Sequence, residues 1–152
     1  MQSEIVEKLL NINREFYQSF GRAFAQTRRR IQPGVRRVLD QWISDGDWLD
    51  IGCGSGALAQ SWYASELRGS YTGIDFSIPL LEEADAALAA KPPRDGLTIS
   101  FRLMDLTTTD WTSLLQKSLF DGILSFAVLH HIPSSEFRHQ LVKQIAGLLK
   151  PG

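Results

Sequence analysis

Residues 48–59 have the sequence WLDIGCGSGALA, which places three glycines at alternate positions directly after a short apolar run. The apolar run predicts a buried parallel strand, and the small residues after it predict a tight turn into a helix. Because glycine has no Cβ, such a turn lets a ligand approach the main chain and the N-terminus of the helix. The stretch therefore predicts a strand, a glycine loop and a helix that bind a nucleotide-like ligand.

The identity of the nucleotide depends on the charge around this loop. Gly52, Gly54 and Ala57 also fit the dinucleotide pattern G-x-G-x-x-G/A. Asp50, two residues before the first glycine, would add negative charge beside a pyrophosphate and suits a positively charged ligand better. The form D-x-G-x-G-x-G resembles the first motif of the class I S-adenosylmethionine-dependent methyltransferases, whose ligand carries a sulfonium and an ammonium. An NAD-dependent oxidoreductase is the alternative.

The rest of the chain alternates between strand and helix patterns. A helix is expected over residues 3–30, broken or kinked near Gly21, with its apolar side chains packed on another element, and a second helix is expected near 35–43. Strands are expected at 48–51, 70–75, 98–104 and 120–126, and helices at 57–66, 77–90 and 135–149. This alternation predicts an α/β fold with a parallel sheet covered on both faces. We expect a helical arm or cap at residues 1–45 and a Rossmann-like cofactor-binding domain at 46–152.

The candidate ligand-binding residues follow the expected strands, since ligands of open parallel sheets bind at the carboxyl ends of the strands. Asp75 ends the second strand, where its carboxylate can accept hydrogen bonds from a ribose diol in either nucleotide hypothesis. Asp105 ends the third strand, and the resemblance implies that it accepts from the adenine amino group while Met104 covers the ring. A Cβ at Gly54 is expected to crowd the loop. The full set predicted to bind S-adenosyl-L-methionine is Asp50, Gly52, Cys53, Gly54, Gly56, Asp75, Phe76, Ser77, Met104, Asp105, Leu106, Phe126 and Arg28.

Three further segments extend the resemblance. Residues 125–133, SFAVLHHIP, are similar to the "VLHH" segment of one large methyltransferase branch, and residues 148–152, LLKPG, are similar to the "LLKPGG" that closes its following helix. Near the N-terminus, Phe16-Tyr17 and the segment FAQTR at 24–28 resemble the entry of the tRNA wobble-uridine carboxymethyl methyltransferases. That family has "W-P" where this chain has Gln32-Pro33. The resemblance implies methyl transfer from S-adenosyl-L-methionine, with a tRNA wobble-uridine carboxylate as an acceptor.

His130, His131 and Arg28 are the candidate catalytic residues. A histidine would act as general base for a hydroxyl or amine acceptor, whereas a carboxylate acceptor needs no base and Arg28 would orient it. Neighbouring side chains at a strand end are expected to point opposite ways, so no metal site is predicted. Cys53 is the only cysteine, which excludes an intrachain disulfide, and we interpret it as a small loop residue.

Charge is distributed unevenly along the chain. Residues 1–38 hold eight Lys or Arg against three Glu, a net charge of +5, and the remaining 114 residues carry −6. This basic arm predicts contact with a polyanion, here tRNA, through Arg28, Arg29, Arg30, Arg36 and Arg37, although a solvated helix face would have the same composition. No apolar run approaches membrane-spanning length and no signal pattern is present, so we expect a cytoplasmic protein with no membrane partner.

The resemblance also predicts more strands than this sequence contains. The class I fold has seven strands in the order 3-2-1-4-5-7-6, and this sequence ends where only the four strands 3-2-1-4 are expected. Strand four would then be an open edge, which favours pairing between copies. We expect a fragment or an edge covered by a partner, with self-association through strand four and little transferase activity. A non-catalytic cofactor-binding or partner-binding module is the third hypothesis.

Overall fold

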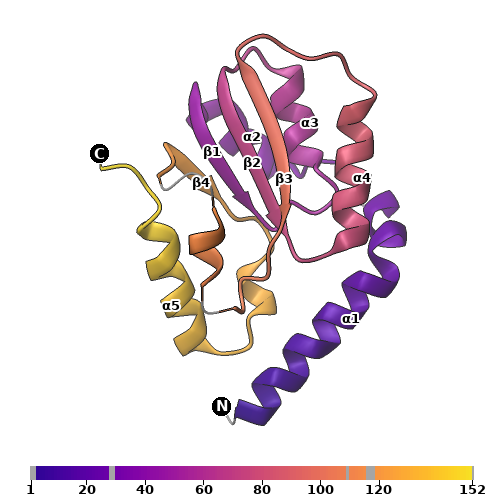
Figure 1. Cartoon of the computed structure of the whole chain (residues 1–152), viewed down its shortest axis with the longest axis vertical. Coiled ribbons are helices and arrows are strands. Elements are labelled where there is room, and N and C mark those ends of the chain that lie inside the picture. Colours follow the sequence, from indigo (N-terminus) through magenta and orange to yellow (C-terminus); the bar gives the residue numbers. More distant parts are fainter. Residues whose placement is uncertain (1–2, 28–29, 109, 116–118, 152) are drawn as a thin grey trace.

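The computed structural model describes residues 3–27, 30–108, 110–115 and 119–151. Its sheet contains four strands, β1 (Gly46–Ile51), β2 (Gly69–Asp75), β3 (Leu97–Leu103) and β4 (Gly122–Leu124). They are parallel and lie in the order β3-β2-β1-β4, as predicted from the sequence (Figure 1). The register aligns Ile51 with Ile74 and Asp75 with Leu103, so the carboxyl ends of the strands form one edge of the sheet.

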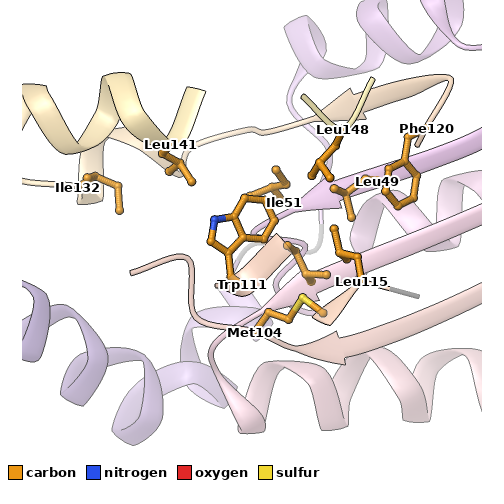
Figure 2. Close-up of a cluster of buried hydrophobic side chains, with 10 residues drawn as sticks. Leu49, Ile51, Met104, Trp111, Leu115, Phe120, Ile132, Leu141 and Leu148 are labelled. Carbon is orange, nitrogen blue, oxygen red and sulfur yellow. The ribbon is translucent and has the colours of Figure 1, made fainter. Parts of the chain in front are cut away.

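Helices cover both faces of this sheet. α2 (Pro33–Trp42), α3 (Ala57–Ala64) and α4 (Ile78–Ala89) lie on one side, and α5 (Ser135–Ala146) lies on the other (Figure 1). Each face has its own apolar cluster. Trp48, Trp62 and Tyr71 belong to the first cluster, together with partly buried residues of α2. The second cluster lies on the face covered by α5. In it, Trp111 of the 3₁₀ turn Trp111–Leu114 is fully buried beside Leu49, Ile51 and Leu141 (Figure 2).

Strand four is shorter than its sequence predicts. β4 has three residues instead of the expected 120–126, and α5 ends at Ala146 instead of Leu149. The chain after α5 returns to the sheet, where the Phe120 N–H donates to the Leu148 carbonyl (2.8 Å) and the Lys150 N–H donates to the Phe120 carbonyl (2.9 Å). This parallel bridge joins Phe120 and Leu149, just before β4 begins. Pairing of two copies of the chain along the outer edge of β4 stays a prediction.

The N-terminal helix α1 (Ser3–Thr27) differs from its prediction in two respects. It continues through Gly21, where a break or kink was expected. Gly21 is instead a point of close packing, because a Cβ there would lie 3.2 Å from Ser77 Oγ and 3.4 Å from Leu80 Cγ. The apolar side chains that were expected to pack on another element are exposed instead, namely Ile5, Leu9, Ile12, Phe16 and Phe20. The opposite face of α1 packs on the carboxyl edge of the sheet and on α4. The predicted division into a helical arm at residues 1–45 and a cofactor-binding domain at 46–152 stays a prediction.

The close packing at Gly21 makes a stability prediction. Gly21→Val should lower the free energy of unfolding by about 1–3 kcal/mol, because the added methyls must displace Ser77 or Leu80. Gly34→Val is the matched control, since it also lies in a helix and no atom lies within 4 Å of its added Cβ. Urea titration of both variants measures the difference, and equal stabilities would contradict close docking of α1 on α4.

Candidate functional site

Two adjoining cavities lie at the carboxyl edge of the sheet, on either side of the glycine loop. The larger has a volume of about 360 Å³ and the smaller about 190 Å³, and they share Gly52, Gly54, Leu80 and Phe126. Of the predicted residues, the larger cavity is lined by Gly52, Gly54, Asp75, Phe76, Met104, Asp105, Leu106, Phe126, His130 and His131. The smaller is lined by Asp50 and Cys53 together with Arg30. Most of the predicted site residues therefore line one of these cavities, although they make up less than half of the residues that surround them.

Two predicted residues, Gly56 and Ser77, lie elsewhere, and a third is not described by the structure. Gly56 is the N-cap of α3, and a Cβ there would lie 2.9 Å from Ala84 Cβ, so it packs α3 on α4. Ser77 is buried and donates from its hydroxyl to the Tyr17 carbonyl (3.1 Å), which ties α4 to α1. Arg28, a candidate for both cofactor and acceptor, lies outside the described residues, as does Arg29.

The glycine loop satisfies most of its own N–H groups. Gly52 and Cys53 donate to the Ile74 carbonyl at 2.8 and 3.0 Å, Gly54 donates to Asp75 Oδ2 at 2.9 Å, and Gly56 donates to the Cys53 carbonyl at 3.1 Å. These four donors are engaged by the protein, which leaves few loop N–H groups for a pyrophosphate.

The loop glycines are required for two different reasons. All three have left-handed φ values, +73° at Gly52, +54° at Gly54 and +74° at Gly56, which favour glycine. A Cβ at Gly54 was expected to crowd the loop. That prediction is wrong for contacts within the protein, because no protein atom lies within 4 Å of a Cβ added at Gly54. That Cβ would point into open space beside the cavities, whereas a Cβ at Gly52 would lie 2.3 Å from Val128 Cγ2.

Asp75 connects the loop to the rest of the site. Its Oδ2 accepts from the Gly54 N–H and its Oδ1 accepts from the Ser77 N–H, both at 2.9 Å. Burial raises the pKa of this carboxyl, and the backbone donors of Ser77, Gly54 and Phe76 lower it, with burial the larger effect. Each carboxylate oxygen retains a lone pair, so Asp75 can also accept from a ligand in the larger cavity.

Asp50 lies beneath the loop and is almost fully buried. The Tyr71 hydroxyl donates a short hydrogen bond to its Oδ2. Burial raises its pKa to about 7, with Asp75 adding to the increase and the Tyr71 hydrogen bond opposing it. Burial and the charges of Asp50 and Asp75 also raise the pKa of Cys53, which holds this side chain as a neutral thiol.

Asp105 at the end of β3 is half-buried and already paired. Its Oδ2 accepts from Arg14 of α1 at 2.7 Å, and its Oδ1 accepts from the Thr107 N–H at 2.9 Å and hydroxyl at 2.6 Å. Burial alone would raise the pKa of Asp105, but the Thr107 and Arg14 hydrogen bonds lower it overall. Asp105 is therefore held as a carboxylate against the adenine side of the predicted site.

The two histidines lie together, contrary to the expectation that they point opposite ways. Residues Leu129–His131 form a 3₁₀ turn beyond β4, and the rings of His130 and His131 have centroids 3.9 Å apart. Burial, and then the neighbouring His130, lower the pKa of His131, so its ring is neutral at pH 7. Among the described residues, no three His, Cys, Asp or Glu side chains lie close enough together to hold a metal ion.

Sequence reasoning missed the part of the site that α1 supplies. Tyr17 Oη lies 3.1 Å from His131 Nε2, and the Asn13 side-chain amide donates to the His131 carbonyl at 3.1 Å. The Tyr17 ring also contacts Phe76 edge-on, with centroids 5.7 Å apart. Leu10, Arg14, Tyr17 and Gly21 recur at helical spacing on the face opposite the apolar stripe, a pattern that could have identified them.

Comparison with known proteins agrees with this geometry. A family described as a methyltransferase domain matches residues 49–152. A protein of Encephalitozoon cuniculi named as a methyltransferase is 32% identical over 138 residues, which cover 90% of this chain and 56% of that protein. A Bos taurus protein named "Probable tRNA methyltransferase 9B" is 27% identical over 139 residues, covering 91% of this chain and 26% of that protein.

A solved structure has the same fold. A SAM-dependent methyltransferase from Methanosarcina mazei superimposes with a TM-score of 0.60 and 25% sequence identity, covering 80% of this chain and 54% of that one. The chain thus spans about half the length of that structure and of the Encephalitozoon protein, and about a quarter of the bovine one. Within the described part of the chain, no helix is both long and apolar enough to span a bilayer.

The buried Asp50 makes a prediction about pH. The pKa of Asp50 is raised from 3.8 in the unfolded chain to about 7 in the folded chain. Between these two pH values the folded protein binds more protons than the unfolded chain does, so its stability falls as pH rises from about 4 to about 7. Asp50→Asn keeps an acceptor for the Tyr71 hydroxyl but does not ionise. From about pH 5 to about pH 8, the parent should lose about 2–3 kcal/mol more unfolding free energy than this variant.

Urea titrations at the two pH values measure this difference. Asp40→Asn is the control, because Asp40 is exposed on α2. The unfolding free energy of this variant should change between the two pH values as much as that of the parent does. Parallel pH curves for the parent and Asp50→Asn would show that Asp50 does not titrate in this range.

Proposed function

The chain belongs to the methyltransferase domain family, and from this premise we propose that it binds S-adenosyl-L-methionine and takes part in methyl transfer. One observation carries the proposal. The carboxylates of Asp50, Asp75 and Asp105 lie at or next to the carboxyl ends of three neighbouring strands, while the glycine loop's N–H groups donate within the protein. Such a site attracts a sulfonium and an ammonium and repels a pyrophosphate, which argues against the NAD-dependent alternative.

The residues present fit this cofactor. Asp75 would accept from the ribose diol, and Met104, Asp105 and Leu106 would surround the adenine in the larger cavity. The smaller cavity would receive the methionine end, where Asp50 faces the ammonium and Arg30 is available for the carboxylate. The open space at Gly54 leaves room for the ligand against the main chain. The bound cofactor supplies an activated methyl group.

The protein's own contribution is orientation and exclusion of water. α1 crosses the carboxyl edge of the sheet, anchored by Arg14 on Asp105, by Gln18 on the Phe76 carbonyl (3.0 Å) and by Arg22 on Glu82 (2.7 Å). Its inner face forms one wall of the larger cavity through Leu10, Asn13 and Tyr17. Because the sulfonium is already a good leaving group, holding an acceptor in line is the main requirement.

The acceptor we propose is the wobble-uridine carboxylate of a tRNA. The bovine relative's name supports a tRNA substrate. The segment FAQTR at 24–28, through its resemblance to the wobble-uridine carboxymethyl methyltransferases, supports the carboxylate. Arg30, Arg36 and Arg37 are exposed beside the smaller cavity or on α2, where a polyanion could reach them. A carboxylate nucleophile needs no base, so the transfer rate should not change as His131 titrates.

A hydroxyl or amine acceptor is the second candidate, and the contact between Tyr17 and His131 favours it. A neutral His131, held by the Tyr17 hydroxyl in the larger cavity, could accept the proton that such a nucleophile loses. The transfer rate would then rise with pH as His131 loses its proton. That pH profile, or labelling of small hydroxylated or amine acceptors in place of tRNA, would contradict the carboxylate proposal.

Asp75 provides the test of cofactor binding. Asp75→Ala should weaken binding of S-adenosylhomocysteine by at least about tenfold, since it removes the ribose acceptor and the anchor of Gly54. Asp105→Ala should cost less, about 0.5–1.5 kcal/mol for one hydrogen bond to a neutral group. Calorimetric titration measures both, with the exposed Asp40→Ala as control. Unchanged affinity in Asp75→Ala would mean that the ligand binds elsewhere.

The basic arm provides the test of tRNA binding. The salt dependence of tRNA binding is the slope of log Kd against log salt concentration. If Arg36 and Arg37 contact phosphates, replacing both by Ala should reduce this slope by up to about 2. Lys143→Ala, on α5 across the sheet, is the control and should leave the slope unchanged. Filter binding at several salt concentrations gives the slopes. A slope equal to the parent's would make these arginines an ordinary solvated face.

A further inference from the structure

The outer face of α1 exposes large apolar side chains in a continuous stripe. Its five members are 40–57% exposed and recur three or four residues apart, and we call them the outer stripe: Ile5, Leu9, Ile12, Phe16 and Phe20. The rings of Phe16 and Phe20 contact each other, with centroids 5.6 Å apart, so the stripe is a packed surface. It extends about 22 Å along the helix. An apolar patch of this shape is typical of an interaction surface.

The stripe is symmetric about its middle. Counted outward from residues 12 and 13, Ile5 and Phe20 are equally distant, and so are Leu9 and Phe16. A second copy of α1 laid antiparallel across a two-fold axis at this point would therefore pair Ile5 with Phe20 of the second copy and Leu9 with its Phe16. Ile12 would meet its own equivalent at the axis. Self-complementarity of this kind is what a two-fold interface requires.

Charges beside the stripe favour the same arrangement. Lys8 and Glu15 are exposed and lie one heptad apart on the same flank of the stripe, on opposite sides of its middle and offset by about 3 Å along the axis, which two long side chains can span. Two antiparallel helices bring such flanking positions into contact, so each Lys8 would face Glu15 of the second copy. A parallel arrangement would leave these opposite charges apart.

The composition of α1 argues against other occupants of the stripe. Between residues 3 and 27, three basic side chains balance three acidic ones, whereas helices that lie on membranes have a strongly basic polar face. Two of the three basic residues, Arg14 and Arg22, are paired with Asp105 and Glu82 of the sheet domain. The outer face of α1 therefore lacks the positive charge that an anionic bilayer or a nucleic acid would require.

The surface involved is sufficient for a weak, specific contact. Burying the exposed half of ten such side chains, five from each copy, removes roughly 1,000 Å² from water, near the lower bound of specific interfaces. In Figure 1, α1 runs along the outside of the molecule with its N-terminal half projecting from the sheet domain, which leaves room for a second helix. We propose that two copies of this chain associate through an antiparallel pair of α1 helices that buries the outer stripe.

Sedimentation velocity over a range of protein concentrations tests this proposal. The parent should pass from monomer to dimer as concentration rises, and Ile12→Glu should remain monomeric throughout, because it places two like charges at the axis. Trp42→Glu is the control, since Trp42 is 75% exposed on α2 but lies outside the stripe, and it should dimerise like the parent. Far-ultraviolet circular dichroism of each variant checks that the fold is retained.

Charge reversal tests the antiparallel register. Lys8→Glu alone and Glu15→Lys alone should each weaken dimerisation by about five- to tenfold, and the double variant should restore the parent affinity within about twofold. A parent that stays monomeric, or a dimer that survives Ile12→Glu, would overturn the proposal. So would a monomer that binds anionic phosphatidylserine vesicles through α1, because the stripe would then be a membrane contact.

Discussion

The hydrogen bonds of the Asp75 carboxylate determine the shape of the whole ligand edge. One oxygen holds the Gly54 N–H and the other holds the Ser77 N–H, so a single side chain joins the glycine loop after β1 to the start of α4 after β2. Ser77 in turn donates to the Tyr17 carbonyl and brings α1 over the same edge. Loop, sheet and covering helix therefore depend on one carboxylate, which is also the group best placed to accept from a ribose.

The electrostatics of the site follow from this arrangement. Burying Asp50 and Asp75 is unfavourable, because burial raises the pKa of both carboxyls and the charge of Asp75 adds to the increase at Asp50. A cationic ligand between them relieves that cost, whereas an anionic one increases it. Asp105 differs, because Arg14 holds it ionised from α1. The covering helix thus contributes charge to the site as well as a wall.

The sequence predicted the glycine loop and half of the residues that line the larger cavity, because each depends on local patterns, and the family resemblance predicted the order of the strands. The run at 48–59 contains its strand, turn and helix within a few residues, and parallel strands necessarily bring their carboxyl ends to one edge. Features set by long-range contacts were not predicted. Gly21 resembles a helix breaker but is needed for packing on α4. β4 is short because the chain leaves the sheet after Leu124 and bends toward the 3₁₀ turn Leu129–His131.

The role of α1 could not be deduced from its apolar residues alone. A stripe of large side chains usually marks the buried face of a helix, yet here the polar face of α1, with Asn13, Arg14 and Tyr17, docks on the sheet domain. Ionic and hydrogen-bonded partners on the sheet edge outweigh the apolar pattern. Those partners come from the connections that follow β2, β3 and β4, and only the folded sheet brings them together.

The central claim is that this edge of the sheet selects an adenosyl ligand that carries an ammonium group over a dinucleotide. Calorimetric titration of the parent chain with S-adenosylhomocysteine and, separately, with NAD measures that selection directly. We predict saturable binding of one S-adenosylhomocysteine per chain and no heat of binding with NAD. Saturable binding of NAD without binding of S-adenosylhomocysteine would contradict the account.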